Sequence, residues 1–403
     1  MTDPDSAKAA ARGSSHLAAA LALLLFFGVL TIWIRGRWAL SLLQAGVFLT
    51  AAAWILGWAR RPGKIQTAGL LVPLTCAPLW GLLQLALGTT VYRFNTWNEI
   101  LFWFSLLAAV FLALQALADA AVCVRFLTAL LYFGVAISIL GTIQLFTSGG
   151  KIFWWFDSGY PDAFGPFVYY NNYAAFAELL LPLAIYRALR DKRRGAVYAI
   201  LAGVLYASVI ASNSRAGAIL CTALLFAVPI LAALKQTGGA RRLMLTTGTL
   251  LAAAALFTAV VGWGRLLERL RHPDPFVHRR EMLLSSLEMA KERPWMGSGL
   301  GTYQEAYPAY ALFDIGRIVN HAHNDWAEWL AEGGVPFLLL TLCFAALTVG
   351  PAIRSVWGLG LLSVYLHALV DYPMQRLGLA LWIFVLAAAV TAADRERRQP
   401  STP

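Results

Sequence analysis

Twelve long apolar runs limit what this chain can fold into more than any other feature of its sequence. A helix needs about 20 apolar residues to cross the ~30 Å hydrocarbon core of a bilayer. Backbone polar groups find no water there, so such segments form helices rather than open strands. With 59% hydrophobic and only 13% charged residues, the chain is too apolar for an ordinary soluble domain. We therefore expect an all-α, polytopic integral membrane protein with about twelve transmembrane helices, at residues 17–34, 38–59, 67–87, 97–118, 122–146, 169–189, 196–211, 215–235, 243–263, 325–350, 355–371 and 376–393.

The basic residues between these runs predict how the chain crosses the membrane. Of the 32 Lys and Arg residues, 18 fall in segments on the side of the two termini and 6 in short segments on the other side. Cytoplasmic loops are enriched in Lys and Arg, so both termini are expected in the cytoplasm. The net charge of +11 then needs no nucleic-acid partner. We expect four parts: nine helices (residues 1–263), one large extracytoplasmic loop (264–324), three helices (325–393) and a cytoplasmic tail (394–403).

The segment Asn320–Gly334, with the sequence NHAHNDWAEWLAEGG, concentrates polar residues where the large loop meets an apolar helix. Ionisable groups at the membrane are costly unless they face water or partners, so they often mark functional sites. A structural alternative is also open. Asn324 or Asp325 could cap the helix, with Glu328 at capping-box distance from Asp325.

Arginines on the same predicted face of the membrane point to a phosphate ligand. Arg215 stands between two apolar runs, and Arg279 and Arg280 lie in a predicted amphipathic helix at residues 276–294. A guanidinium fork matches phosphate geometry, and a histidine can take a proton from an attacking hydroxyl. This combination suits attack on a lipid-diphosphate-linked donor, with the arginines neutralising the leaving group. A lone arginine at a helix end can also simply snorkel to the interface.

The sequence is also compatible with two other chemistries. His321, His323 and Asp325 match the start of the H-x-H-x-D-H metallohydrolase motif, but Trp326 stands where the last ligand belongs. Zinc needs about four ligands, so we expect no metal, and nothing indicates another cofactor. A transporter is the non-enzymatic alternative, because transporters carry ionisable residues and broken helices near the bilayer midplane. The features that favour it are Glu178 and the prolines within apolar runs, Pro182, Pro229 and Pro336.

Four motifs in order make the chain resemble the O-antigen ligase and polymerase superfamily of bacterial envelope glycan enzymes. His323-Asn324, followed after nine residues by Gly334, is similar to the family's His-[Asn/Ser/Gln]-x9-Gly motif. In the large loop, Arg279-x-x-x-Leu283 leads through a proline to the glycine-rich segment 297–301. The two earlier matches are Ser214-Arg215-Ala216-Gly217 and Asn171-Asn172-Tyr173-Ala174.

The resemblance implies a metal-independent, inverting glycosyltransferase of the bacterial inner membrane. It would move a glycan from undecaprenyl diphosphate to a hydroxyl acceptor on the periplasmic face, without a cofactor. For an O-antigen ligase, the favoured assignment, the acceptor is lipid A-core. A polymerase or a protein O-oligosaccharyltransferase of the same superfamily is the alternative, and membrane lipids are the only other partners expected.

The resemblance also assigns roles to residues by position. His323 would be the general base, and Arg215 and Arg279 would clamp the diphosphate. His321 is an alternative candidate for the base, because it lies two residues before His323. Arg280 is an alternative candidate for the clamp, because it directly follows Arg279. The further candidates for substrate binding are Asn324 and Tyr303.

Overall fold

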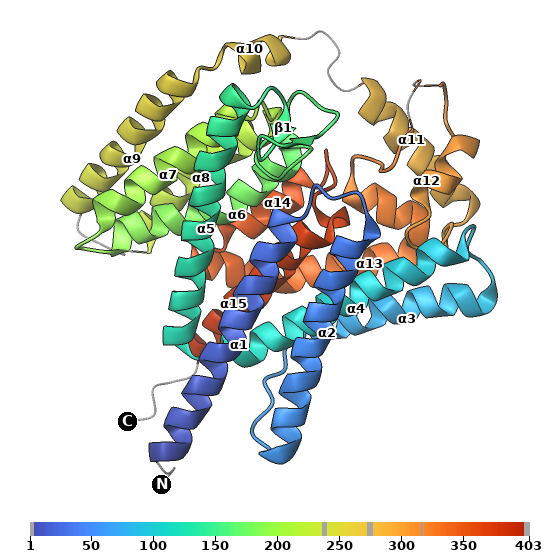
Figure 1. Ribbon diagram of the computed structural model, residues 1–403, viewed down its shortest axis with the longest axis horizontal. Helices are drawn as coiled ribbons and strands as arrows, with labels where there is room; N and C mark the ends of the chain where they lie inside the picture. Colours follow the sequence, from blue (N-terminus) through green and yellow to red (C-terminus); the bar gives the residue numbers. More distant parts are fainter. Residues whose placement is uncertain (1–3, 236–239, 272–276, 315, 317, 399–403) are drawn as a thin grey trace.

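The computed structural model describes residues 4–235, 240–271, 277–314, 316 and 318–398, and nearly all of its regular structure is helical (Figure 1). The helices of the predicted runs are α1 (Pro4–Leu30), α2 (Arg37–Arg60), α3 (Leu71–Leu87), α4 (Arg93–Ala116), α5 (Ala120–Thr147), α6 (Tyr170–Arg190), α7 (Gly195–Ala211), α8 (Arg215–Leu234), α9 (Ala240–Val261), α13 (Asp325–Ser355), α14 (Leu359–His367) and α15 (Leu377–Arg398). The shorter elements are β1 (Lys151–Ile152), β2 (Phe156–Asp157), α10 (Gly264–Leu270), α11 (Val277–Glu292), α12 (Tyr303–Ala306), η1 (Tyr307–Ala309) and η2 (Pro373–Gln375).

Each predicted apolar run contains a helix, which confirms the all-α class. Within the described residues, eight helices are long and apolar enough to cross a membrane: α1, α2, α4, α5, α8, α9, α13 and α15. Helices α3 and α7 are apolar but have only 17 residues each. Helix α14 has nine residues, which at 1.5 Å per residue give a length of only ~13 Å. A polytopic membrane protein is therefore supported, whereas the number of twelve crossings is not confirmed.

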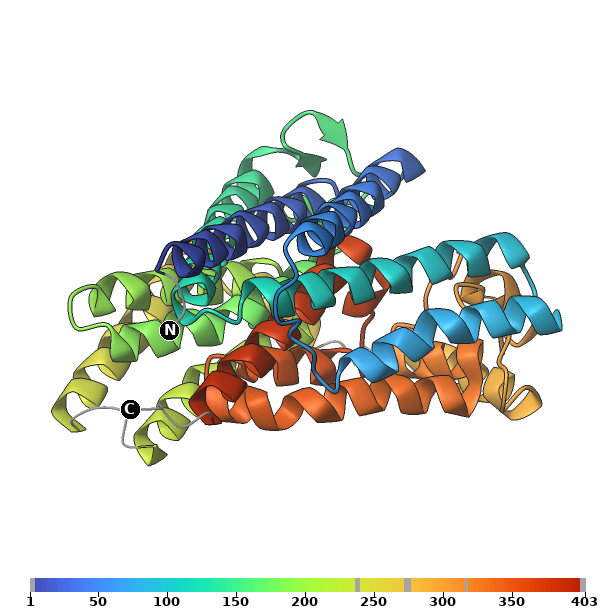
Figure 2. The same ribbon diagram turned by 90° about the horizontal axis from the view of Figure 1, so that it is seen from below.

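Helix α15 lies at the centre of the bundle. In its most apolar stretch 89% of the residues are buried, against 11% in α9. Figure 2 shows α1 and α2 on one side of α4 and α15, with α3 and α13 on the other. Apolar side chains gain little by leaving lipid, so helices in a membrane pack through close fit and small residues. Accordingly, a Cβ on Gly378 of α15 would overlap the Gly28 carbonyl of α1.

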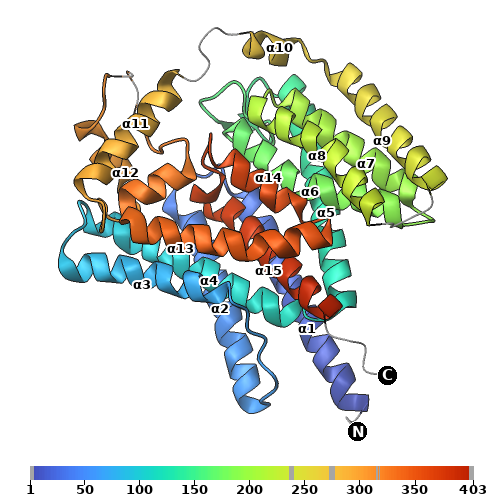
Figure 3. The same ribbon diagram turned by 180° about the vertical axis from the view of Figure 1, so that it is seen from behind.

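The segments that carry the predicted site residues gather at one end of the molecule. Helices α10 and α11 and the β1–β2 hairpin lie at the end opposite to the two termini (Figure 1). Figure 3 shows α13 beside α3 and α14. The predicted large loop therefore contains α10, α11, α12 and η1, and it lies over the beginning of α13.

Candidate active site

His323 stands just before α13 in a backbone conformation that residues other than glycine rarely adopt. Its φ is 52°, in the left-handed region, which costs on the order of 1–3 kcal/mol. Asn324 caps the helix: its side-chain oxygen accepts from the Ala327 N–H at 3.0 Å, and its amide donates to the Leu369 carbonyl at 2.9 Å. Asn324 is thus the cap, and not Asp325. The strain sits at the histidine, and strained residues of this kind cluster at functional sites.

A buried carboxylate, Asp371, faces the imidazole of His323. It lies between α14 and α15 and is 1% exposed, with Oδ1 3.7 Å from His323 Nδ1. Its Oδ2 accepts from Arg279 Nη2 at 3.1 Å and also from the Asn171 side-chain amide. Burial alone raises the pKa of Asp371, but the neighbouring His323 and the Arg279 guanidinium lower it to about 2. Asp371 is therefore ionised at neutral pH.

Tyr169, just before α6, connects the arginine to the histidine. Its hydroxyl accepts from Arg279 Nη2 at 3.0 Å and lies 3.5 Å from His323 Nδ1. Its ring stacks on Tyr372, at 5.5 Å between centroids, and Tyr372 stacks on His321 at 4.5 Å. The His323 ring meets both tyrosines edge-on. These contacts fix the orientation of the His323 imidazole, with Nδ1 toward Asp371.

A cavity of about 150 Å³, with charged and polar side chains among its lining residues, opens beside Arg279. Arg215, the first residue of α8, lines the same cavity. Ser214 caps α8 by accepting a hydrogen bond from the Gly217 N–H at 3.1 Å. Two guanidinium groups on one concave surface attract an anion. The other lining residues are Tyr170, Asn171, Asn213, Ala216, Ile219 and Val370.

A third arginine, Arg269 of α10, braces the wall of this cavity. Its Nη2 is 2.9 Å from Asp162 Oδ2, and its guanidinium lies 4.6 Å from the centre of the Tyr170 ring. Its carbonyl accepts from Arg215 Nη1 at 3.4 Å, and its Nη1 donates to the Asn213 carbonyl at 3.5 Å. Arg269 therefore joins the large loop to the segment between α5 and α6, next to the two arginines of the cavity.

The glycine-rich segment 297–301 and Gly334 meet, although they are far apart in the sequence. Gly334 has φ 72° and interrupts α13 with a kink. A Cβ on it would lie 2.5 Å from the Trp295 carbonyl oxygen. The Gly299 N–H donates to the Glu332 carbonyl at 2.9 Å, and the Gly301 N–H to the Glu332 carboxylate at 2.9 Å. This contact docks the end of α11 on α13, the two helices whose beginnings carry the arginine and the histidine of the site.

The remaining predicted residues lie at or away from the cavity. His321 Nδ1 is 2.8 Å from Glu328 Oε1, so this histidine is tied to the start of α13. Arg280 is exposed on α11 and is not among the residues that line the cavity. Tyr303 is 1% exposed, and its hydroxyl is 3.1 Å from Ser286 Oγ. Its contacts are those of a residue that packs α12 against α11.

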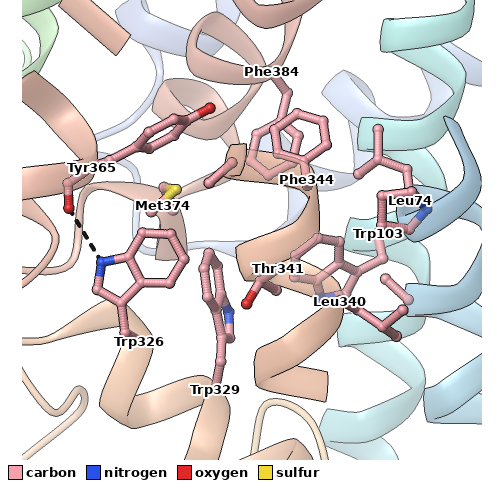
Figure 4. A pocket seen from close by; sticks show the side chains of 13 residues that line it. Leu74, Trp103, Trp326, Trp329, Leu340, Thr341, Phe344, Tyr365, Met374 and Phe384 are labelled. Carbon is pink, nitrogen blue, oxygen red and sulfur yellow. Dashed lines mark hydrogen bonds between the residues drawn. The ribbon is translucent and has the colours of Figure 1, made fainter. Parts of the chain in front are cut away.

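A second hollow, between α3, α4, α13 and α15, is apolar (Figure 4). One of its lining residues is Trp326, which lies three residues after His323. The indole N–H of Trp326 donates to the Tyr365 carbonyl at 3.2 Å. Its free space is only about 10 Å³, about that of one water molecule. It is a gap in aromatic packing, and it differs in both size and polarity from the cavity of the arginines. Its lining residues are Pro73, Leu74, Ala77, Trp103, Trp326, Trp329, Leu340, Thr341, Phe344, Ala345, Tyr365, Met374 and Phe384.

Sequence reasoning assigned no role to the residues that connect the site. Asp371 is the acceptor that Arg279 and Asn171 share, and Tyr169 lies between the arginine and the histidine. A signal did exist for Asp371, because it opens a short polar stretch, residues 371–376, on the predicted extracytoplasmic face. Asn171 was part of a motif, but its partner, 200 positions away, had no signature in the sequence.

Fold and site together define a polytopic helical membrane protein with a cavity at one end that two arginines help to line. Residues 193–342 match the family model described as O-antigen ligase. This match, over 150 of the 403 residues, confirms the predicted resemblance and supports the O-antigen ligase and polymerase superfamily and a function in glycan transfer. No curated protein matches the chain.

Proposed function

We propose that the chain is a metal-independent, inverting glycosyltransferase that moves a glycan from undecaprenyl diphosphate to a hydroxyl acceptor. One observation carries this proposal: Arg215 and Arg279 line the same cavity, and Asp371 bridges Arg279 to His323. Paired guanidinium groups suit the two phosphates of the donor. The family match supports glycan transfer in general.

In the proposed reaction the acceptor oxygen attacks the anomeric carbon of the donor sugar. His323 takes the hydroxyl proton on Nε2, because Nδ1 faces Asp371. As the new carbon–oxygen bond forms, the bond from the anomeric carbon to the phosphate oxygen breaks. Its electron pair stays on the diphosphate, where Arg215 and Arg279 stabilise the added charge. Attack opposite to the leaving group inverts the anomeric centre, and the imidazolium then releases its proton to water.

Asp371 has a defined part in this mechanism. A carboxylate beside the imidazole stabilises the positive charge that appears when His323 takes the proton. It also lies against Arg279. The Asp371 carboxylate therefore contacts both the residue that takes up the proton and a residue that binds the leaving group. We assign the clamp to Arg279 rather than Arg280, because only Arg279 lines the cavity. We assign the base to His323 rather than His321, whose Nδ1 is held by a carboxylate of α13.

We place this site on the periplasmic face of the bacterial inner membrane, with both termini in the cytoplasm. The distribution of basic residues supports this orientation. The division into nine helices, the loop 264–324, three further helices and a tail belongs to the same proposal. Twelve crossings would require α14 and its flanking residues to complete one passage.

O-antigen ligase, with lipid A-core as acceptor, is the specific activity we propose. A deletion strain distinguishes it from the related activities. Long glycans that remain on the lipid carrier indicate a ligase, and single repeat units on the carrier indicate a polymerase. Loss of glycan from proteins alone indicates a protein O-oligosaccharyltransferase.

Transfer by the purified protein in detergent, with a lipid-diphosphate-linked glycan as donor, tests the proposal. His323→Ala should abolish transfer, and His278→Ala, at an exposed histidine of α11, should leave it unchanged. Full activity of His323→Ala would refute the assigned base, and loss in His321→Ala alone would move the role to His321. No gradient exists in detergent, so a strict requirement for a gradient in vesicles would favour transport.

A further inference from the structure

Helix α6 bears two polar residues that reach the same segment of chain, residues 367–371. Asn171 donates to Asp371, and Glu178, seven residues further along α6, accepts from His367. Seven residues are two helical turns, so both side chains lie on one face of α6 about 10 Å apart. His367 and Asp371 are four residues apart. The two contacts therefore connect α6 to the end of α14 and the residues after it at two levels. The proposed active site uses only the contact between Asn171 and Asp371.

The contact between Glu178 and His367 is entirely buried. Glu178 and His367 are both 0% exposed, with 2.7 Å between Glu178 Oε1 and His367 Nδ1. The other carboxylate oxygen of Glu178 accepts from Ser363 Oγ at 2.8 Å. Ser363 and His367 are one turn apart on α14, so a single carboxylate holds this helix at two successive turns. Ionisable groups inside a membrane bundle are costly and mark functional positions.

The two helices also touch through their backbones at this level. A Cβ on Gly360 of α14 would lie 2.5 Å from the Glu178 carbonyl oxygen. Gly360, Ser363 and His367 follow the spacing of one helix face, and all three meet Glu178. Apolar contacts in lipid are non-directional and let a nine-residue helix slide or rotate. Directional contacts prevent both motions, which fits the use of buried polar pairs to fix register.

We propose that Glu178 and His367 are positioning residues for Asp371. The pair locks the end of α14 against α6, and the carboxylate four residues further on is thereby kept against His323 and Arg279. This inference rests on the proposed function, since it assigns the pair a role in presenting the carboxylate that serves the base.

Turnover of purified variants in the transfer assay tests the inference. Glu178→Ala should lower kcat by about 100-fold, the effect of a misplacement of about 1 Å, and leave the KM for the donor unchanged. Glu178→Gln keeps a hydrogen-bonding amide for Ser363 and His367, so it should recover most of the activity. Thr348→Val is the matched control: it removes a buried hydrogen bond of 3.0 Å between Thr348 and Tyr365 on another side of α14. It should retain wild-type kcat at a comparable loss of thermal stability.

A double-mutant cycle separates positioning from a general structural role. If Glu178 acts only through Asp371, Glu178→Ala should cause no further loss in an Asp371→Asn background. Additive losses, or equal kcat in Glu178→Ala and Thr348→Val, would overturn the inference. Should Glu178→Ala fail to fold, His367→Gln takes its place in the cycle. Absence of transfer by the wild-type protein would refute the proposed function itself, whereas transfer by the wild type leaves the positioning role to be decided by this cycle.

Discussion

Asp371 and Glu332 are both carboxylates, and both are almost completely buried, at 1% and 3% exposure. Their partners differ. Glu332 accepts from two backbone groups, the Gly301 N–H at 2.9 Å and the Tyr303 N–H at 2.7 Å. Asp371 accepts from one backbone group, the N–H of the adjacent Tyr372 at 2.9 Å, and otherwise meets side chains from three separate segments: Asn171 of α6, Arg279 of α11 and His323 before α13.

This difference in partners distinguishes a carboxylate that stabilises the fold, Glu332, from one that belongs to the candidate active site, Asp371. A backbone N–H cannot leave Glu332 unless the glycine-rich turn rearranges, so this carboxylate fastens the loop to α13. The side chains around Asp371 can change partner without any change of fold, and a cavity of about 150 Å³ lies beside them. Burial alone therefore does not identify a functional carboxylate in this bundle. The chemistry of the partners and an adjoining cavity do.

Replacement of the two carboxylates by amides should give the largest contrast. Asp371→Asn removes the charge that stabilises protonated His323, and we expect kcat to fall by at least about 100-fold. Glu332→Gln keeps an acceptor oxygen for only one of the two backbone N–H groups, so stability should fall, but turnover per folded molecule should be close to wild type. Steady-state transfer measured per folded protein checks both. Similar losses in the two variants would remove the distinction between scaffold and site.

Lysine at the two arginines should give the next largest effect. Arg215→Lys and Arg279→Lys keep the charge but lose the fork that binds two phosphate oxygens. One charge-assisted hydrogen bond contributes about 1.5 kcal/mol, so the KM for the lipid-diphosphate donor should rise about tenfold in each variant. Arg280→Lys is the matched control beside the cavity, with no change expected. Wild-type KM values in the first two variants would mean that charge alone is sufficient.

On the scaffold side, Gly334→Ala should affect stability more than chemistry. Its φ of 72° and the 2.5 Å approach to the Trp295 carbonyl oxygen leave no room for a Cβ. We expect a loss of about 1–3 kcal/mol of folding free energy, seen as a lower melting temperature in detergent. The folded fraction should keep its KM for the donor. Gly13→Ala, where a Cβ would meet nothing within 4 Å, is the control and should melt at or slightly above the wild-type temperature, because alanine favours a helix more than glycine does.

The sequence predicted the parts of this molecule that depend on hydropathy and local spacing. Apolar runs gave the helices and their approximate ends, and the motifs placed Arg215, Arg279 and His323 in segments that the fold brings to one end. The length of α14 was wrong, because the apolar run through residue 371 does not reveal that the helix ends at His367. The backbone after His367 is irregular, and this irregular segment is where Asp371 can turn toward the site.

Contacts between distant segments could not be predicted from this single sequence. The docking of residues 297–301 on Gly334 depends on backbone conformation, and each segment alone has only the pattern of a turn. Likewise Glu178 was an isolated charge within an apolar run and therefore favoured a transporter. Its partner, His367, is 189 positions away, and the sequence alone did not reveal it. In each case the local pattern identified an unusual residue, and only the fold supplied its partner.

The smallest predicted effect concerns Tyr303, a candidate for substrate binding from the sequence. Its hydroxyl contacts Ser286 Oγ at 3.1 Å and the Met282 carbonyl at 3.3 Å. Both partners belong to α11, and Tyr303 does not line the cavity. Tyr303→Phe should therefore cost about 0.5–1.5 kcal/mol of stability for the lost hydrogen bond, with the KM values of both substrates unchanged. If the KM for the acceptor rises while the melting temperature stays unchanged, Tyr303 belongs to the active site. Helix α12 would then be part of the site and not only of the scaffold.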